Sequence, residues 1–307
     1  MFIRSNLPGM AALICVIASA NVLAARGHQG SYHSSVLGRV VNFTVYLPDG
    51  YSGTTGKYPA VYLLHGLDGN EMEAMSNGAL STLDAMLKRR EIPPMLAIMP
   101  SFGKQSWWTD GARDQSETAL MEELIPYVEN RYRIASQRAA RSLAGWSMGG
   151  YGALNLAMKY PARFCAAAAI NPELHDPLPP ATSAIRRTPQ FMRQGVFDAA
   201  AWQALNYPAR IDSYGKSTIR VPLWLAASDD DALPGMTLKV ARLHARLLAI
   251  QPGQTELKIF GAERDDRWAA LRDALPDALR YISLHCADRQ PAKASGMRID
   301  DPADTSR

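Results

Sequence analysis

Leu143-Ala144-Gly145-Trp146-Ser147-Met148-Gly149-Gly150-Tyr151-Gly152 is the stretch that decides the fold. A short apolar run typical of a strand leads into it, and small and apolar residues typical of a helix follow as far as Pro161. Glycines at 145 and 149 let a strand and a helix approach closely around the serine, because glycine has no Cβ atom. The stretch therefore predicts a sharp strand-to-helix turn with Ser147 at its tip.

A serine on such a turn is typical of a nucleophile that attacks a carbonyl carbon. The turn holds the hydroxyl clear of the backbone, and the amide of the next residue, Met148, points to where an oxyanion forms. A glycine-rich turn with an incidental serine is the alternative interpretation. The strand-like and helix-like flanks favour the nucleophile.

Strand-like and helix-like segments alternate along the chain. We expect a hairpin at 33–46, strands at 58–64, 95–99, 141–144, 164–170, 221–227 and 255–260, and helices at 77–90, 116–132, 151–160, 238–249 and 268–285. This alternation predicts an α/β fold with a mostly parallel central sheet and helices on both faces. The proline-rich segment 171–217, with one expected helix at 198–205, is typical of a lid or substrate wall.

The N-terminal segment has the pattern of a targeting sequence. Arg4 precedes an apolar run at 10–20, and the small residues at 18–20 and 22–24 offer cleavage sites. We expect a signal peptide at 1–25, a domain at 26–286 and a disordered polar tail at 287–307, with secretion or a periplasmic location. An uncleaved membrane anchor is the alternative, and we expect no other contact with a membrane.

The composition of the chain limits the classes of partner and cofactor that we expect, and its cysteines indicate the redox state of the thiols. A net charge of +4 over 307 residues, without basic runs interleaved with aromatics, argues against a nucleic-acid partner. The histidines do not cluster at ligand spacing and no nucleotide loop is present, so we expect neither a metal nor a cofactor. Cys165 and Cys286 remain after the predicted cleavage, and buried free thiols are favoured over a single bridge.

Several ordered segments besides the serine turn resemble the esterase D-like family of the α/β-hydrolases. They are Leu63-Leu64-His65-Gly66-Leu67, Asn77-Gly78-Ala79-Leu80, Ile92-Pro93-Pro94-Met95, Ser106-Trp107-Trp108-Thr109-Asp110 and Glu122-Glu123-Leu124-Ile125-Pro126-Tyr127. The resemblance extends from about Val36 to Tyr281. It implies the α/β-hydrolase fold and a serine carboxylic-ester hydrolase or acyltransferase that works through an acyl-enzyme.

The resemblance also assigns roles to individual residues. It implies that Ser147 is the nucleophile and that the amides of Leu67 and Met148 form the oxyanion hole. His65 would shape the loop that carries Leu67. Trp107 and Trp108 would line the acyl or alcohol pocket, with core packing as the alternative.

The resemblance also implies a catalytic triad, in which an acid and a base assist the serine. These two positions match the family less well than Ser147 does. The family's acid falls on Asp231, with Asp230 as the next choice and a solvated acidic turn as the alternative. The family's histidine falls on Asp266 in an alignment backward from 275–279, and on Glu263 in an alignment forward from Gly261. The catalytic histidine is therefore replaced in both alignments.

A carboxylate with a pKa near 4 is a poor base at neutral pH, although Asp266 facing Asp231 would raise one of their pKa values. His175 follows a strand on the expected site edge and is a candidate substitute, with an ordinary loop histidine as the alternative. We therefore weigh a secreted ester hydrolase with a weakened base, a catalytically silent binding protein, and a hydrolase whose partner supplies the base. The substrate would be a small-molecule, polysaccharide or lipid ester, and the sequence does not indicate an oligomeric state.

Overall fold

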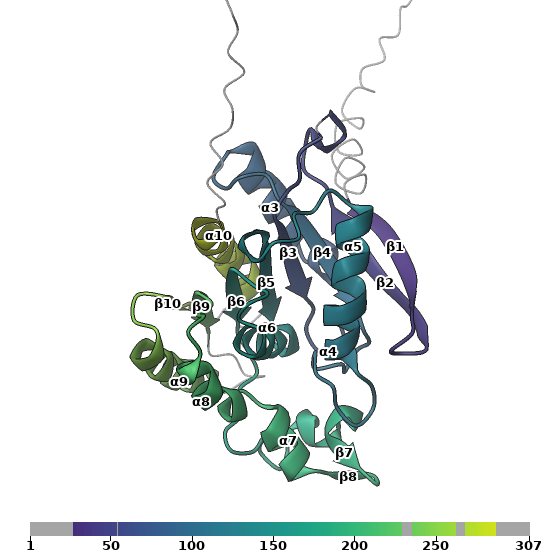
Figure 1. Ribbon diagram of the computed structural model, residues 1–307. Coiled ribbons are helices and arrows are strands. Elements are labelled where there is room, and N and C mark those ends of the chain that lie inside the picture. Colours follow the sequence, from purple (N-terminus) through teal and green to yellow (C-terminus); the bar gives the residue numbers. More distant parts are fainter. Residues whose placement is uncertain (1–26, 54, 229–234, 262–267, 287–307) are drawn as a thin grey trace, which may run out of the picture.

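The computed structural model describes residues 27–53, 55–228, 235–261 and 268–286. A central sheet of eight strands has the order β1-β2-β4-β3-β5-β6-β9-β10 (Figure 1). The strands are β1 (Gly27–Ser34), β2 (Arg39–Tyr46), β3 (Ala60–Leu64), β4 (Leu96–Ser101), β5 (Arg141–Trp146), β6 (Ala166–Ile170), β9 (Leu223–Ala227) and β10 (Thr255–Ile259). Only the β1–β2 and β2–β4 pairs are antiparallel, which confirms the mostly parallel sheet.

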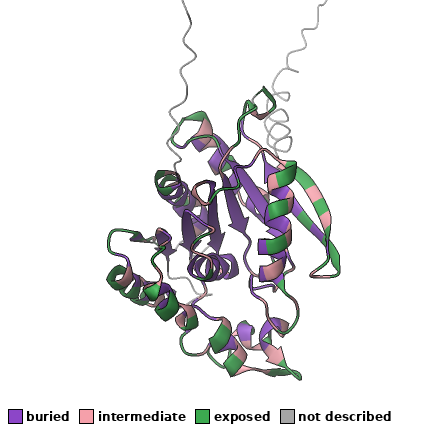
Figure 2. Cartoon of the chain, viewed as in Figure 1, coloured by how far each residue is buried: buried purple, intermediate pink, exposed green. Residues whose placement is uncertain are grey.

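Helices cover both faces of this sheet, and its central strands β3, β4, β5, β6 and β9 are buried (Figure 2). The helices are α2 (Glu73–Ser76), α3 (Ala79–Lys88), α4 (Ser116–Thr118), α5 (Ile125–Arg131), α6 (Met148–Lys159), α7 (Ala199–Leu205), α8 (Pro208–Lys216), α9 (Met236–Ile250) and α10 (Ala269–His285). Alternate residues of β3 pack on opposite faces of the sheet, because successive side chains of a strand point in opposite directions. Val61 and Leu63 pack in the cluster of α3 and α10, whereas Tyr62 and Leu64 pack in the cluster of α5, α6 and α9.

Every strand and long helix expected from the sequence is present with shifted ends, and the hairpin expected at 33–46 begins earlier, because β1 starts at Gly27. The expected helix at 116–132 consists of α4, a π-helical turn at Ala119–Leu124, and α5. The segment 171–217 is more ordered than predicted, because it also holds α8 and a small hairpin of β7 (Met192–Arg193) and β8 (Val196–Phe197). A proline usually argues against a helix, so Pro208 gave no indication of α8. At the first turn of a helix, however, a proline loses no hydrogen bond.

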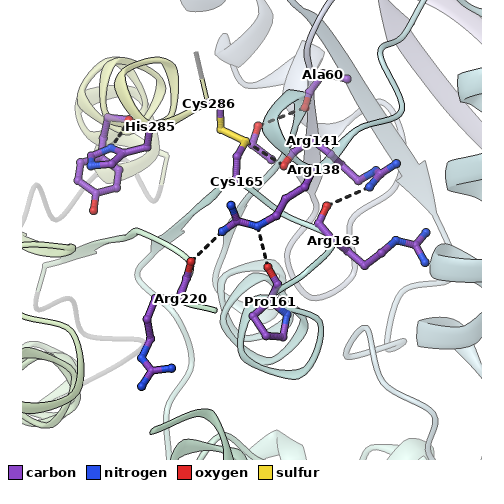
Figure 3. Close-up of a disulfide and its surroundings, with 11 residues drawn as sticks. Ala60, Arg138, Arg141, Pro161, Arg163, Cys165, Arg220, His285 and Cys286 are labelled. Carbon is purple, nitrogen blue, oxygen red and sulfur yellow. Dashed lines mark hydrogen bonds between the residues drawn. A yellow bond between two sulfur atoms is a disulfide. The ribbon is translucent and has the colours of Figure 1, made fainter. Parts of the chain in front are cut away.

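The prediction of free thiols is wrong, because Cys165 and Cys286 form a disulfide (Figure 3). Cys165 immediately precedes β6 and Cys286 immediately follows α10. Helix α10 packs on β6 and brings the two residues to a Cα–Cα distance of 5.2 Å, although 121 residues separate them in the chain. Two cysteines so far apart carry no pairing signal that the sequence alone reveals.

The parts predicted to be a signal peptide and a polar tail lie outside the described residues. In the ranges that are described, none of the helices combines the length and the apolar character that a membrane crossing requires.

Candidate active site

Ser147 stands between the end of β5 and the start of α6, on the turn that the sequence predicted. Its backbone has φ 53° and ψ −120°, a conformation that non-glycine residues rarely adopt. The flanking glycines make it attainable. A Cβ atom on Gly145 would lie 2.3 Å from the carbonyl oxygen of Gly149, so a side chain at position 145 would force the strand and helix apart.

The backbone of Ser147 is fixed on both sides by the end of β6 and the segment that follows it. The Ser147 amide donates a hydrogen bond of 3.0 Å to the carbonyl of Ile170, and the Glu173 amide donates one of 3.3 Å to the carbonyl of Ser147. Strain at a functional serine persists only where the surrounding structure holds it. These bonds therefore fix the position of the side chain.

The loop after β3 brings Leu67 close to the serine. A Cβ atom on Gly66 would lie 3.6 Å from that of Ser147, which places this loop directly against the turn. The Gly66 amide donates to the buried carboxylate of Glu73 at 2.9 Å, and the Asp68 amide donates to the carbonyl of Lys104 at 2.9 Å. The loop is thus held on both sides of Leu67.

The amides of Leu67 and Met148 remain unengaged by any hydrogen bond within the described part of the chain. Met148 is the first residue of α6, so its amide also stands at the positive end of the helix dipole. Two such donors beside a serine are the arrangement that stabilises an oxyanion. Both amides are therefore available as donors beside Ser147, and their role as an oxyanion hole stays a prediction.

Ser147 lies on the wall of a cavity of about 580 Å³. A volume of this size accommodates a small-molecule ligand. The wall combines the serine turn, the Leu67 loop, the segments that follow β6, and the first turns of α9 and α10. Its polar and ionisable residues include Asp68, Glu73, Ser147, Asn171, Glu173, His175, Thr182, Ser183 and Lys239.

The two tryptophans predicted to line the pocket lie elsewhere. Trp107 and Trp108 are both 0% exposed, and neither belongs to the cavity wall. Trp107 packs against Tyr151, Phe191 and Trp202. The packing alternative is therefore correct, because both rings are buried members of the core.

Trp108 instead supports the loop of His65. Its indole Nε1 donates a hydrogen bond of 3.3 Å to the His65 carbonyl, and the two rings pack edge to face. The imidazole Nδ1 of His65 lies 2.8 Å from the Gly66 carbonyl, and burial lowers the pKa of this histidine to about 4. His65 is therefore neutral near pH 7 and acts as a structural part of the loop, as the resemblance implied.

His175 does reach the cavity. Its side chain is only 8% exposed, its Nδ1 lies 3.1 Å from Nζ of Lys239, and its Nε2 lies 3.6 Å from a carboxylate oxygen of Glu173. Sequence reasoning missed Glu173 and Lys239 as members of this group. Glu173 carried the same signal as His175, since it follows a strand on the site edge, whereas a lysine on an amphipathic helix resembles any exposed lysine.

The predicted acid and base lie outside the described residues, together with their alternatives. These are Asp231 and Asp230 in one segment, and Asp266 and Glu263 in the other. The described residues that flank the two segments meet at the same cavity. Met236 and Trp268, on the carboxyl side of the first and second segment respectively, both line its wall.

A serine turn at the carboxyl edge of a mostly parallel sheet covered by helices is the arrangement of the α/β-hydrolase fold. The sequence profile of the family described as Putative esterase matches residues 34–280, so the chain belongs to that family. This confirms the resemblance recognised in the sequence.

Two curated relatives match part of the chain. An esterase of Mycobacterium tuberculosis is 31% identical over 142 residues, which are 44% of this chain and 30% of that protein. The endo-1,4-beta-xylanase/feruloyl esterase of Xylanibacter ruminicola is 27% identical over 146 residues, which are 44% of this chain and 20% of that protein. The matched stretch thus spans less than a third of either relative.

Solved structures match over a larger share of the chain. A ferulic acid esterase has a TM-score of 0.70 at 21% identity, over 85% of this chain and 98% of its own. The fluorophosphonate-binding serine hydrolase FphF of Staphylococcus aureus has a TM-score of 0.63 at 20% identity, over 84% of this chain and 98% of its own. At these identities the likeness shows the shared fold.

Proposed function

We propose that this chain is a carboxylic-ester hydrolase or acyltransferase that forms an acyl-enzyme on Ser147. The observation that carries the proposal is a serine at a strained turn on the wall of a cavity, beside the unengaged amides of Leu67 and Met148. Membership of the Putative esterase family supports the same chemistry.

In the proposed reaction, the Ser147 hydroxyl attacks the ester carbonyl carbon, and the developing oxyanion accepts hydrogen bonds from the two amides. Loss of the alcohol leaves an acyl group on the serine. Attack by water then gives hydrolysis, whereas attack by a second alcohol gives acyl transfer. Asp231 is the proposed triad acid, and Asp266 is the base that the sequence alignment offers.

The proposed substrates are small-molecule esters, acylated polysaccharides or lipid esters. The names of the feruloyl esterase relative and the ferulic acid esterase structure favour an aryl ester as the first one to try. We further propose export, since residues 1–25 have the pattern of a cleaved signal peptide. Export disfavours a glutathione thioester, which is a cytosolic substrate.

Labelling of the full chain with a fluorophosphonate probe, alongside hydrolysis of a short-chain nitrophenyl ester, tests the reaction. We expect both activities to disappear in Ser147→Ala. Ser183→Ala is the matched control, because Ser183 lines the same cavity but caps a short helical turn with its side chain. A folded protein that shows neither labelling nor turnover contradicts the proposal. N-terminal sequencing of the exported chain checks the cleavage.

The replaced histidine favours a second candidate, a catalytically silent member of the family that binds an ester or a partner in the same cavity. Loss of a triad base costs on the order of 10⁴- to 10⁶-fold in rate. This candidate predicts a folded chain that binds an aryl ester without turning it over. Calorimetric titration with a feruloyl ester and with its free acid distinguishes the two functions.

A further inference from the structure

Three ionisable side chains form a connected group on the cavity wall. Nζ of Lys239 lies 3.1 Å from Nδ1 of His175, and Nε2 of His175 lies 3.6 Å from the carboxylate of Glu173. All three residues line the cavity that holds Ser147. The Nε2 atom of His175 is buried and makes no hydrogen bond within the described part of the chain.

Successive contacts join this group to the serine turn. The Glu173 amide donates to the Ser147 carbonyl at 3.3 Å, and the next amide, that of Leu174, donates to Sδ of Met236 at 3.4 Å. Met236 begins α9, and Lys239 follows one turn later. The serine turn, the segment after β6 and the first turn of α9 therefore form one packed unit around the cavity.

Two features of its surroundings act against the positive charge of Lys239. Burial lowers the pKa of its ammonium group below the ordinary value, although the carboxylate of Glu173 opposes this effect. The position in the first turn of α9 also disfavours a positive charge, because the amino end of a helix carries a partial positive charge. A lysine in such a setting can accept a proton.

The other described charges around Lys239 are few. Asp68 reaches the cavity from the loop after β3, and Glu73 reaches it from the start of α2. On α9 itself, Arg242 is exposed and Arg246 pairs with Asp176 at 3.8 Å. Within the described ranges, Lys239 is thus the one amine on this cavity wall.

The tautomer of His175 decides whether this residue or Lys239 can be the base. Either atom of the contact between Nζ of Lys239 and Nδ1 of His175 can donate, and in the arrangement proposed here the lysine donates and Nδ1 accepts. The neutral ring then holds its proton on Nε2, facing Glu173, and has no lone pair left to accept one from the serine. His175 instead orients the lysine, and Glu173 orients His175.

We propose that Lys239 removes the proton from Ser147 during acylation, in the role that a histidine fills elsewhere in the family, with His175 and Glu173 as positioning residues. This inference rests on the proposed function. Its geometric basis is the shared cavity wall and the chain of contacts from Ser147 to Lys239.

The proton and electron balance is simple. Oγ of Ser147 bonds to the ester carbon, its proton moves to the neutral Lys239 amine, and the carbonyl electron pair moves onto the oxygen held by the two amides. When the carbon–oxygen bond to the alcohol breaks, the Lys239 ammonium returns the proton to the leaving alkoxide. Water repeats the cycle with the acyl-enzyme, releasing the carboxylic acid and restoring Ser147.

Substitutions at Lys239 distinguish two roles for this residue, that of a proton acceptor and that of a fixed positive charge. Arginine keeps the charge but stays protonated at any assay pH, so Lys239→Arg and Lys239→Met should lower the rate of fluorophosphonate labelling alike, by at least about 100-fold. The exposed Lys216 supplies the matched control, and Lys216→Met should label at the wild-type rate. In wild type the labelling rate should rise with pH, and this rise should vanish in both Lys239 variants.

Chemical rescue distinguishes loss of the amine from misfolding of the variant, because only a folded variant can regain activity when the amine is restored. Because Cys165 and Cys286 are paired, Lys239→Cys adds a thiol that 2-bromoethylamine converts into a lysine-like amine. We expect this treatment to restore labelling at least about 10-fold, with wild-type chain as the control for reaction at Cys15.

The outcomes distinguish this inference from the proposed function. Wild-type labelling rates in Lys239→Arg and Lys239→Met, with losses in Asp266→Asn or Asp231→Asn instead, overturn the role of Lys239 and leave the esterase intact. A wild-type chain without Ser147-dependent labelling overturns both. His175→Gln should keep a rising pH profile at a lower rate, and an abolished rise would instead make His175 the base.

Discussion

A Cβ atom on Gly149 would lie 1.9 Å from the carbonyl oxygen of Leu64, so α6 begins in backbone contact with the end of β3. No flexible side chain is available to yield at this contact. Gly149→Ala should therefore lower the free energy of unfolding by about 3 kcal/mol or more and abolish labelling of Ser147, because the turn must open. Urea unfolding followed by circular dichroism measures the loss.

Gly56 is the matched control for this substitution. A Cβ atom there would meet no other atom within 4 Å, and the residue is exposed. Gly56→Ala should leave the free energy of unfolding within about 0.5 kcal/mol of wild type. Equal losses in the two variants would show that the close approach of α6 and β3 does not constrain the turn.

The disulfide should stabilise the chain without contributing to the reaction. It joins the start of β6 to the end of α10, whereas Ser147 follows the carboxyl end of the neighbouring strand β5. Cys286→Ala should lower the free energy of unfolding by about 2–5 kcal/mol while the folded protein still labels at 25 °C.

A reducing agent supplies the internal control for that prediction. It should lower the melting temperature of wild type to that of Cys286→Ala and leave the variant unchanged. A wild-type melting temperature that does not respond to reduction, with the thiols shown to be free, would remove the disulfide from the account of stability.

The features that the sequence predicted correctly are those that neighbouring residues in the chain determine. The glycines at 145 and 149 determine the turn around Ser147, and the short apolar runs such as 60–64 are typical of strands buried on both faces. Leu67 is placed by the same logic, since it follows a strand that ends beside the turn.

The parts that sequence missed depend on contacts between distant segments. Pairing of Cys165 with Cys286 requires α10 to return to the start of β6, and the grouping of His175 with Lys239 requires α9 to dock on the segment after β6. The burial of Trp107 likewise depends on distant segments, since its ring packs against Tyr151 and Trp202. Asp231 and Asp266 stay predictions.

The buried ion pair between Arg141 and Glu129 should be a large single contribution to stability. Arg141 donates to both carboxylate oxygens of Glu129, at 2.7 and 2.9 Å, and also to the carbonyl of Ser136 at 2.7 Å. Both side chains are less than a tenth exposed. Arg141→Met should cost about 3–5 kcal/mol, because it leaves a buried carboxylate without its partner.

A double-mutant cycle isolates that pair. Glu129→Gln in the Arg141→Met background should recover part of the loss, because the second substitution removes the unpaired charge. Losses that simply add would show that the two side chains do not stabilise one another. Arg89→Met, at an exposed pair with Glu91, is the control and should cost no more than about 1 kcal/mol.

His65 should make the fold sensitive to mild acid. Burial lowers its pKa from 6.5 to about 4, so between these values the unfolded chain binds a proton that the folded chain does not. Stability therefore rises with pH across this window, and acidification from pH 7 to pH 4 should remove about 3 kcal/mol through this residue alone. Urea unfolding at intervals across the window measures the slope.

Other groups titrate in the same range, so the test is a comparison of slopes. His65→Asn should flatten the pH dependence between pH 6.5 and pH 4, whereas His33→Asn, at an exposed position on β1, should leave it unchanged. Parallel slopes in wild type and His65→Asn would mean that the imidazole is protonated in the folded state. The loop that positions Leu67 would then carry a positive charge beside the proposed oxyanion hole.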